Sequence, residues 1–297
     1  MTDLRVLTGY SPDDRGDDAL ALACLVVRTA GAHLTVANVH PPAWPARGPG
    51  SVDAEWIAYL EEQAQLALKQ AGERLSGVPK KDVDFVVAAN RGSGRGLLEV
   101  ARDADAGLVV VGSAPRGRRG RIAIGSTADQ LLHGSPVPVL LAPRGYAEDA
   151  PKKFERLTIA YWRRPATEPA LRAAAELARS LDLPIRLVTL VLRPPGLAAK
   201  FRNADEVMRR QLDQAEKDLD HAAGLISGDA EVTTEALLGT GISKTLGNLE
   251  TLPGEVLACM SSHDGPLRKV FLGESSGKIV RAATCPVLVL PRGTATR

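Results

Sequence analysis

The chain has 297 residues, a length that one hydrophobic core rarely supports and that predicts two domains of about 150 residues each. With 44% apolar and 24% charged residues it has the composition of a soluble globular protein, and no apolar run reaches the roughly 18 residues that cross a bilayer. The formal net charge of +2 is too small to indicate a nucleic-acid partner, which requires a concentrated basic face.

The N-terminal residues do not have the layout of a secretory signal. Met-Thr-Asp-Leu-Arg runs directly into a strand-like apolar segment, without a basic stretch or a small-residue cleavage site. We therefore expect a cytoplasmic protein. Cys24, Cys259 and Cys285 are far apart and lie among small apolar residues, a setting typical of buried free thiols.

Short runs rich in Val, Ile and Leu, the pattern of strands buried in a parallel sheet, alternate with helical patterns along the chain. Strands are predicted at Leu4–Leu7, His33–Val39, Val83–Ala89, Leu108–Val111, Val137–Leu141, Leu157–Tyr161, Pro184–Leu192, Glu231–Leu238, Glu255–Cys259 and Val287–Leu290. Helices are predicted at Asp17–Ala30, Ala54–Leu75, Leu97–Asp103, Glu168–Leu181, Ala204–Ile226 and Lys244–Leu249. The alternation predicts an α/β fold built from βαβ units.

The two halves of the chain repeat each other. Gly125 precedes Pro138 by thirteen positions, and Gly273 precedes Pro286 by the same number, with an apolar strand following in each case. Internal similarity of this kind indicates a duplicated unit. The segment Arg144–Lys153 has no apolar periodicity and is expected to be the linker, which gives domains of residues 1–147 and 152–297.

The loop after the fourth predicted strand has the composition of a phosphate site. In an open parallel sheet, ligands bind beyond the carboxyl ends of the strands, where this loop lies. Gly112 and Gly125 allow close approach of backbone N–H groups, a helix beginning near Ser126 and Thr127 favours an anion, and Arg116 leads a run of four arginines. These residues predict a phosphate cradle; the alternative is a solvated connection in which Ser126 only caps a helix.

At this loop the chain resembles the universal stress protein family, whose fingerprint is Gly, two residues, Gly, nine residues, then Gly with Ser or Thr. Gly112, Gly125 and Ser126 match it, and Pro115 replaces the middle glycine. The resemblance covers essentially the whole chain, twice. It implies two tandem doubly wound domains, each with a five-stranded parallel sheet of order 3-2-1-4-5 and of the adenine nucleotide alpha hydrolase-like type. It also implies pairing between copies through their last strands, and homodimers.

The resemblance further implies ATP as a ligand of the first half. Family members that bind ATP resemble one another at two positions: an Asp ends the first strand, near the adenine, and a Val ends the second strand. Val39 matches the second feature, whereas Gly9 stands in the place of the Asp; Asp13 and Asp14 are either substitutes or acids of a helix start. The candidate cofactor-binding residues are Gly9, Val39, Gly112, Arg116, Gly125, Ser126 and Thr127.

The second half has lost most of this pattern. Met260 and His263 replace the first two glycines of the fingerprint, and Glu274 replaces the hydroxyl residue after Gly273. Because a carboxylate repels phosphate, we expect a degenerate site that does not bind ATP.

The sequence contains no His-Glu-x-x-His and no paired-cysteine motif, and no catalytic residue is predicted. The segment Arg91–Gly96 resembles a dinucleotide fingerprint only weakly and is expected to be a flexible loop with helix capping. We therefore predict a stress-response regulatory protein that is not an enzyme, although slow ATP hydrolysis stays open. The alternative is an interaction scaffold that binds no nucleotide and acts through domain pairing.

Overall fold

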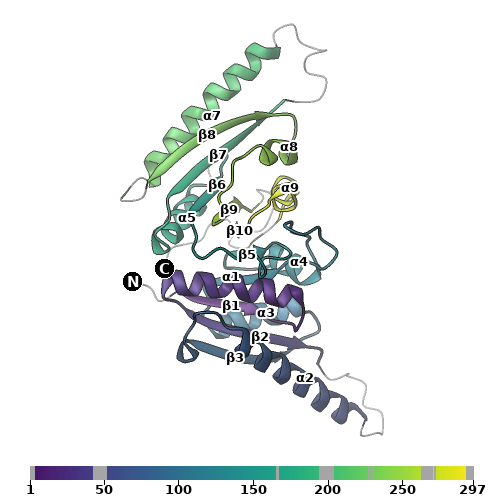
Figure 1. Ribbon diagram of the computed structural model, residues 1–297. Helices are drawn as coiled ribbons and strands as arrows, with labels where there is room; N and C mark the ends of the chain where they lie inside the picture. Colours follow the sequence, from purple (N-terminus) through teal and green to yellow (C-terminus); the bar gives the residue numbers. More distant parts are fainter. Residues whose placement is uncertain are drawn as a thin grey trace. The chain divides into compact units, whose positions relative to one another are not determined.

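The computed structural model describes residues 4–42, 52–164, 167–193, 204–226, 228, 231–261, 270 and 272–291. The chain divides into two compact units, Met1–Ala150 and Pro151–Arg297, and each is described by itself. Both are α/β units with parallel strands (Figure 1).

The first unit contains, in its described part, a parallel sheet with the strand order β3-β2-β1-β4-β5. Val6 of β1 lies opposite Leu34 of β2 on one side and Leu108 of β4 on the other, in register. The central strands are almost entirely buried, which is why they are made of Val and Leu. The strands are β1 (Arg5–Gly9), β2 (His33–His40), β3 (Val83–Ala89), β4 (Leu108–Gly112) and β5 (Val139–Ala142).

Helices cover both faces of this sheet. Two glycines at strand ends show that both faces are covered. A Cβ added to Gly112 would point at Arg15 of the first helix, whereas a Cβ added to Gly9 would point at Leu97 of the third helix. Gly31, with φ +63°, ends the first helix and donates its N–H to Val27. The helices are α1 (Asp14–Ala30), α2 (Val52–Arg74), the short 3₁₀ helix η1 (Lys80–Asp82), α3 (Ser93–Asp103) and α4 (Ser126–Leu132).

The second unit repeats the arrangement, with the strand order β8-β7-β6-β9-β10. Counted from the start of each unit, both orders are 3-2-1-4-5, as predicted. The strands are β6 (Arg156–Ala160), β7 (Ile185–Leu192), β8 (Val232–Gly239), β9 (Glu255–Met260) and β10 (Val287–Leu290). The helices are α5 (Glu168–Ser180), α7 (Ala204–Ile226), α8 (Ile242–Gly247) and α9 (Glu274–Ala282).

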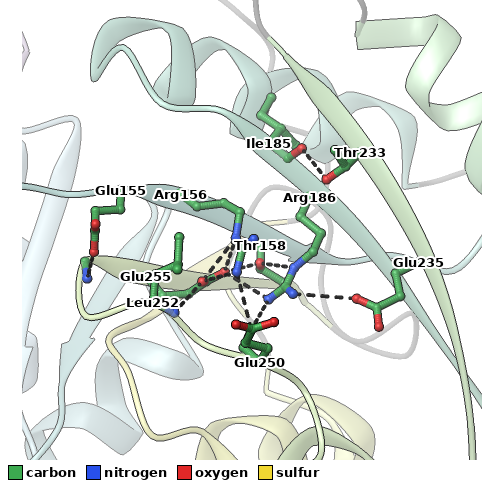
Figure 2. A network of polar contacts seen from close by, with 11 residues as sticks. Glu155, Arg156, Thr158, Ile185, Arg186, Thr233, Glu235, Glu250, Leu252 and Glu255 are labelled. Atoms are coloured by element: carbon green, nitrogen blue, oxygen red, sulfur yellow. Dashed lines mark hydrogen bonds and ion pairs between the residues drawn. The ribbon is translucent and has the colours of Figure 1, made fainter.

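A buried ionic network lies at the amino-terminal ends of β6, β7 and β9 in the second unit (Figure 2). Glu255, which is 1% exposed, accepts hydrogen bonds from Arg156 at 2.7 Å and from Arg186 at 3.2 Å. Thr158 and the Leu252 amide donate to the same carboxylate. A buried charge is tolerated only when it is paired and hydrogen bonded, and Glu255 is both.

Two helix starts differ from the sequence prediction by more than two residues. α3 begins at Ser93, four positions before the predicted Leu97, and α1 begins at Asp14 rather than Asp17. In α3 the early residues include Gly94 and Gly96, which pack so closely that a Cβ on Gly96 would lie 2.5 Å from Val39. Because glycine has no apolar side chain, such packing leaves no periodic signal in the sequence.

The cysteines are buried and free, as predicted. Burial raises the pKa of Cys259 and of Cys285 to about 12, so neither thiol ionises readily.

Candidate functional site

Gly9, Val39 and Gly112 all lie at the carboxyl edge of the first sheet, the edge at which a ligand of this fold binds. α3 covers two of them from one face. A Cβ on Gly9 would lie 2.8 Å from a methyl group of Leu97, and Val39 packs against Gly96. The structure therefore brings the two positions predicted to border an adenine together under the first turns of α3.

Gly112 has a packing role on the opposite face. A Cβ at this position would lie 2.1 Å from the backbone oxygen of Arg15, closer than any contact a folded chain accepts. The glycine thus allows the first turn of α1 to pack against the end of β4, which is a reason for it that involves no ligand.

Asp13 caps α1. Its carboxylate accepts hydrogen bonds from the amides of Arg15 at 3.0 Å and Gly16 at 3.2 Å, and it pairs with the Arg15 guanidinium at 2.5 Å. Partial burial opposes ionisation, but these bonds hold the pKa of Asp13 below its ordinary value. Of the two interpretations of this acid, the geometry is that of a helix start.

The loop between β4 and α4 is closed upon itself at its base. The Ala114 amide donates to Ala123 at 2.8 Å, and the Ala123 amide donates to the buried Ser113 hydroxyl at 2.9 Å. A turn from Ala114 to Gly117, with a bond of 3.1 Å between them, carries Pro115 at its second position, where proline's fixed φ fits. Pro115 therefore shapes the exposed tip that presents Arg116.

The start of α4 has no side-chain cap. Gly125 is the N-cap residue, and no side chain bonds the first turn. Ser126, which is exposed, is the first helical residue and not the cap, so the capping role considered for it is wrong. The Thr127 hydroxyl oxygen lies 2.5 Å from that of Ser93. The first amides of a helix have no partner within it, and here they are left for solvent or an anion.

The arginines of this loop fall into two groups. Arg119 forms ion pairs with Glu148 at 2.6 Å and Asp149 at 3.1 Å, which raise its pKa. Arg116 and Arg118 are exposed and have no ion pair with any residue that the structure describes. Only these last two are therefore available to a ligand without breaking an existing pair.

In the second unit, the equivalent helix start carries a negative charge. Gly273 is the N-cap of α9 and Glu274 its first residue, paired with Lys278 at 2.6 Å. The pair lowers the pKa of Glu274, which keeps the carboxylate ionised. His263 and the rest of 262–269 lie outside the described residues.

Among the described residues, none of the helices has the length and apolar character needed to span a membrane. Within the same ranges, no three His, Cys, Asp or Glu side chains are grouped as metal ligands.

Both halves match a model of the universal stress protein family, at residues 4–143 and 153–291. A universal stress protein of Mycobacterium tuberculosis H37Rv is 35% identical over 298 residues, covering 97% of this chain and all of its own. Another, from Mycolicibacterium smegmatis, is 25% identical over 304 residues and 97% of each chain. The crystal structure of a universal stress protein from Archaeoglobus fulgidus DSM 4304 has a similar fold, with a TM-score of 0.62 at 14% identity, and covers 99% of this chain and 100% of that one.

The structure is thus that of a tandem α/β protein with two doubly wound parallel sheets. Taken with the two family matches, it shows that the chain belongs to the universal stress protein family.

Proposed function

We propose that this protein is a cytoplasmic stress-response regulator, not an enzyme, whose first unit binds ATP reversibly through its phosphates. One observation carries the proposal: the uncapped start of α4 follows a loop in which Arg116 and Arg118 have no acidic partner among the described residues. Backbone N–H groups and guanidinium groups are the donors that phosphate oxygens prefer.

Each predicted residue except Gly112, which packs against α1, has a place in this proposal. Gly125 lets the chain turn into α4 without a side chain over its first amides, Ser126 and Thr127 offer those amides, and Arg116 supplies charge. Ser126 also presents a free-standing exposed hydroxyl, whereas the Thr127 hydroxyl is already in contact with Ser93. Gly9 and Val39 would border the base.

The second unit is proposed not to bind ATP in this manner. Glu274 stands at the first position of α9, where the first unit has Ser126, and it is ionised. A carboxylate at that position repels a phosphate. We therefore expect one nucleotide per chain.

Calorimetric titration of ATP into the full chain tests the proposal. The expected result is one site, with affinity about tenfold lower in Arg116→Gln/Arg118→Gln. Arg119→Gln is the matched control, because its charge is already paired, and its affinity should change less than about twofold. No heat at millimolar ATP, or two nucleotides per chain, contradicts the proposal.

A second candidate is a scaffold that binds no nucleotide and acts through pairing of its units or of whole chains. It is favoured by Gly112 and Pro115, since packing against Arg15 and a tight turn explain these two residues without any ligand. Analysis of the nucleotide released from freshly purified protein separates the candidates: bound ATP or AMP supports the regulator, and empty protein supports the scaffold.

A further inference from the structure

A second glycine- and arginine-rich segment, Arg91–Gly96, lies at the same edge of the first sheet. It was expected to be a flexible loop, but the structure shows that Gly92 is an N-cap and that α3 begins at Ser93. Gly94 and Gly96 are buried, whereas Arg91 and Arg95 are exposed. The segment is therefore a fixed helix start that directs two arginines into solvent.

The starts of α3 and α4 are packed against each other. The Ser93 and Thr127 hydroxyl oxygens lie 2.5 Å apart, and the Arg95 amide donates to the Gln130 side chain at 3.2 Å. A Cβ on Gly94 would lie 2.7 Å from the Thr127 backbone oxygen, so the glycine permits the contact. Arg91 and Arg95 consequently belong to the same surface as the β4–α4 loop.

This surface has an excess of positive charge. Like Arg116 and Arg118, neither Arg91 nor Arg95 forms an ion pair with a described residue. Two acids on these helices form no ion pair with the four arginines: Glu99 accepts a hydrogen bond from Asn90 at 3.0 Å, and Asp129 lies 3.3 Å from His133. Two of these arginines lie at the start of α3 and two in the loop that leads to α4, and like charges gathered on one surface favour the binding of an anion.

We propose that Arg91 and Arg95 extend the phosphate site of the first unit, so that it binds linear inorganic polyphosphate more tightly than a triphosphate. This rests on the proposed function, in which only the phosphates of ATP lie along the Gly112–Thr127 loop. A polyphosphate chain carries a negative charge on every unit and places further phosphates beyond the third. Guanidinium groups bind phosphate oxygens in a bidentate manner, which suits a repeated ligand with no base to recognise.

The test titrates the full chain with tripolyphosphate, a longer inorganic polyphosphate, ATP and single-stranded RNA, compared per phosphate unit. The variant is Arg91→Gln/Arg95→Gln. Arg102→Gln is the matched control, since Arg102 lies on the same helix and is exposed but pairs with Asp103 at 3.3 Å. Thermal unfolding of each variant confirms that the fold is kept.

The longer polyphosphate should bind at least about tenfold more tightly than tripolyphosphate. The Arg91→Gln/Arg95→Gln variant should bind the longer polyphosphate about tenfold more weakly than the wild type does, whereas its affinity for ATP should fall by less than about twofold. The control should match the wild type. Equal losses for ATP and polyphosphate, no loss at all, or tighter binding of RNA each overturn the extension. If neither ATP nor tripolyphosphate binds the wild type, the proposed function itself fails. If ATP binds through Arg116 but the longer polyphosphate binds no more tightly than tripolyphosphate, only the extension fails.

Discussion

Asp18 on α1 and Gly145, 127 residues later, are joined by a hydrogen bond of 2.8 Å from the Gly145 amide to the Asp18 carboxylate. The Ala147 amide donates to the other carboxylate oxygen, also at 2.8 Å. Gly145 has φ +82°, a conformation that favours glycine, and Tyr146 is buried behind it. The beginning of the segment expected to be a linker is therefore folded onto the first unit.

Replacing Asp18 should loosen this attachment. Asp18 is 3% exposed, and Asp18→Ala leaves two amides without their acceptor, at a cost of about 2 kcal/mol in the free energy of unfolding of the first unit. Amide hydrogen exchange of residues 143–149 should accelerate most. Asp14→Ala, on the exposed side of the same helix, should cost well under about 1 kcal/mol. Equal protection of 143–149 in wild type and Asp18→Ala would show that the bonds do not hold the segment.

Glu255 should make the second unit sensitive to acid. Burial alone raises its pKa, but the bonds from Arg156, Thr158 and Leu252, with the charge of Arg186, bring the pKa below the ordinary 4.5. A lowered folded-state pKa means that the stabilisation is present above pH 4.5 and is lost as the pH falls through the folded-state value. Exchange of β6 and β9 peptides, measured between about pH 6 and about pH 3, should reveal this loss.

Two variants separate the buried pair from its exposed neighbour. Glu255→Gln leaves Arg156 and Arg186 without their shared partner and should cost about 3 kcal/mol, with most of the acid dependence removed. Glu235 also pairs with Arg186, at 3.6 Å, but its side chain is 41% exposed. Glu235→Gln should therefore cost less than about 1 kcal/mol. A similar loss in both variants would contradict the dominant role of the buried carboxylate.

Ionisation of Asp18 should make the stability of the first unit depend on pH in the opposite direction. Burial is the main cause that raises the pKa of this carboxyl, although the Ala147 and Gly145 amides oppose the rise. Stabilisation from a raised pKa is complete below the ordinary value of 3.8 and is lost as the pH increases through the folded-state value. Comparing β4 with β9 peptides over the same pH series distinguishes the two behaviours within one chain.

The sequence predicted the sheet well for a physical reason. The central strands of both parallel sheets are buried on two faces, so each is a short apolar run with a clear signal, and the observed strand bounds differ from the predicted ones by at most two residues. The strand order of both units was predicted from the family resemblance, which covers each half. The start of α3 was missed because its close contacts are made by Gly94 and Gly96.

The candidate site was only partly predictable. Gly112, Gly125 and Ser126 could be found by their spacing, but the spacing does not say that Gly112 packs against Arg15 or that Gly125 is the cap. Nor could it show that Arg119 is engaged by Glu148, because that pair depends on how the chain folds back after β5. Which arginines lack an ion pair among the described residues is a property of tertiary structure, and the proposed phosphate site rests on it.

Gly112 and Gly125 both belong to the fingerprint, but changing each to alanine should lower the free energy of unfolding by very different amounts. Gly112→Ala places a methyl group 2.1 Å from the backbone oxygen of Arg15, which can move only with α1, and should cost about 3 kcal/mol or more. Gly125→Ala places its methyl group 3.1 Å from the Ala114 side chain, where a small shift suffices, and should cost about 1 kcal/mol. Denaturant unfolding gives the total, and exchange of α1 and β4 peptides assigns it to the first unit, with β9 as the internal reference. Comparable costs at the two glycines would mean that α1 yields easily to a side chain at position 112, and the packing role given to Gly112 would be wrong.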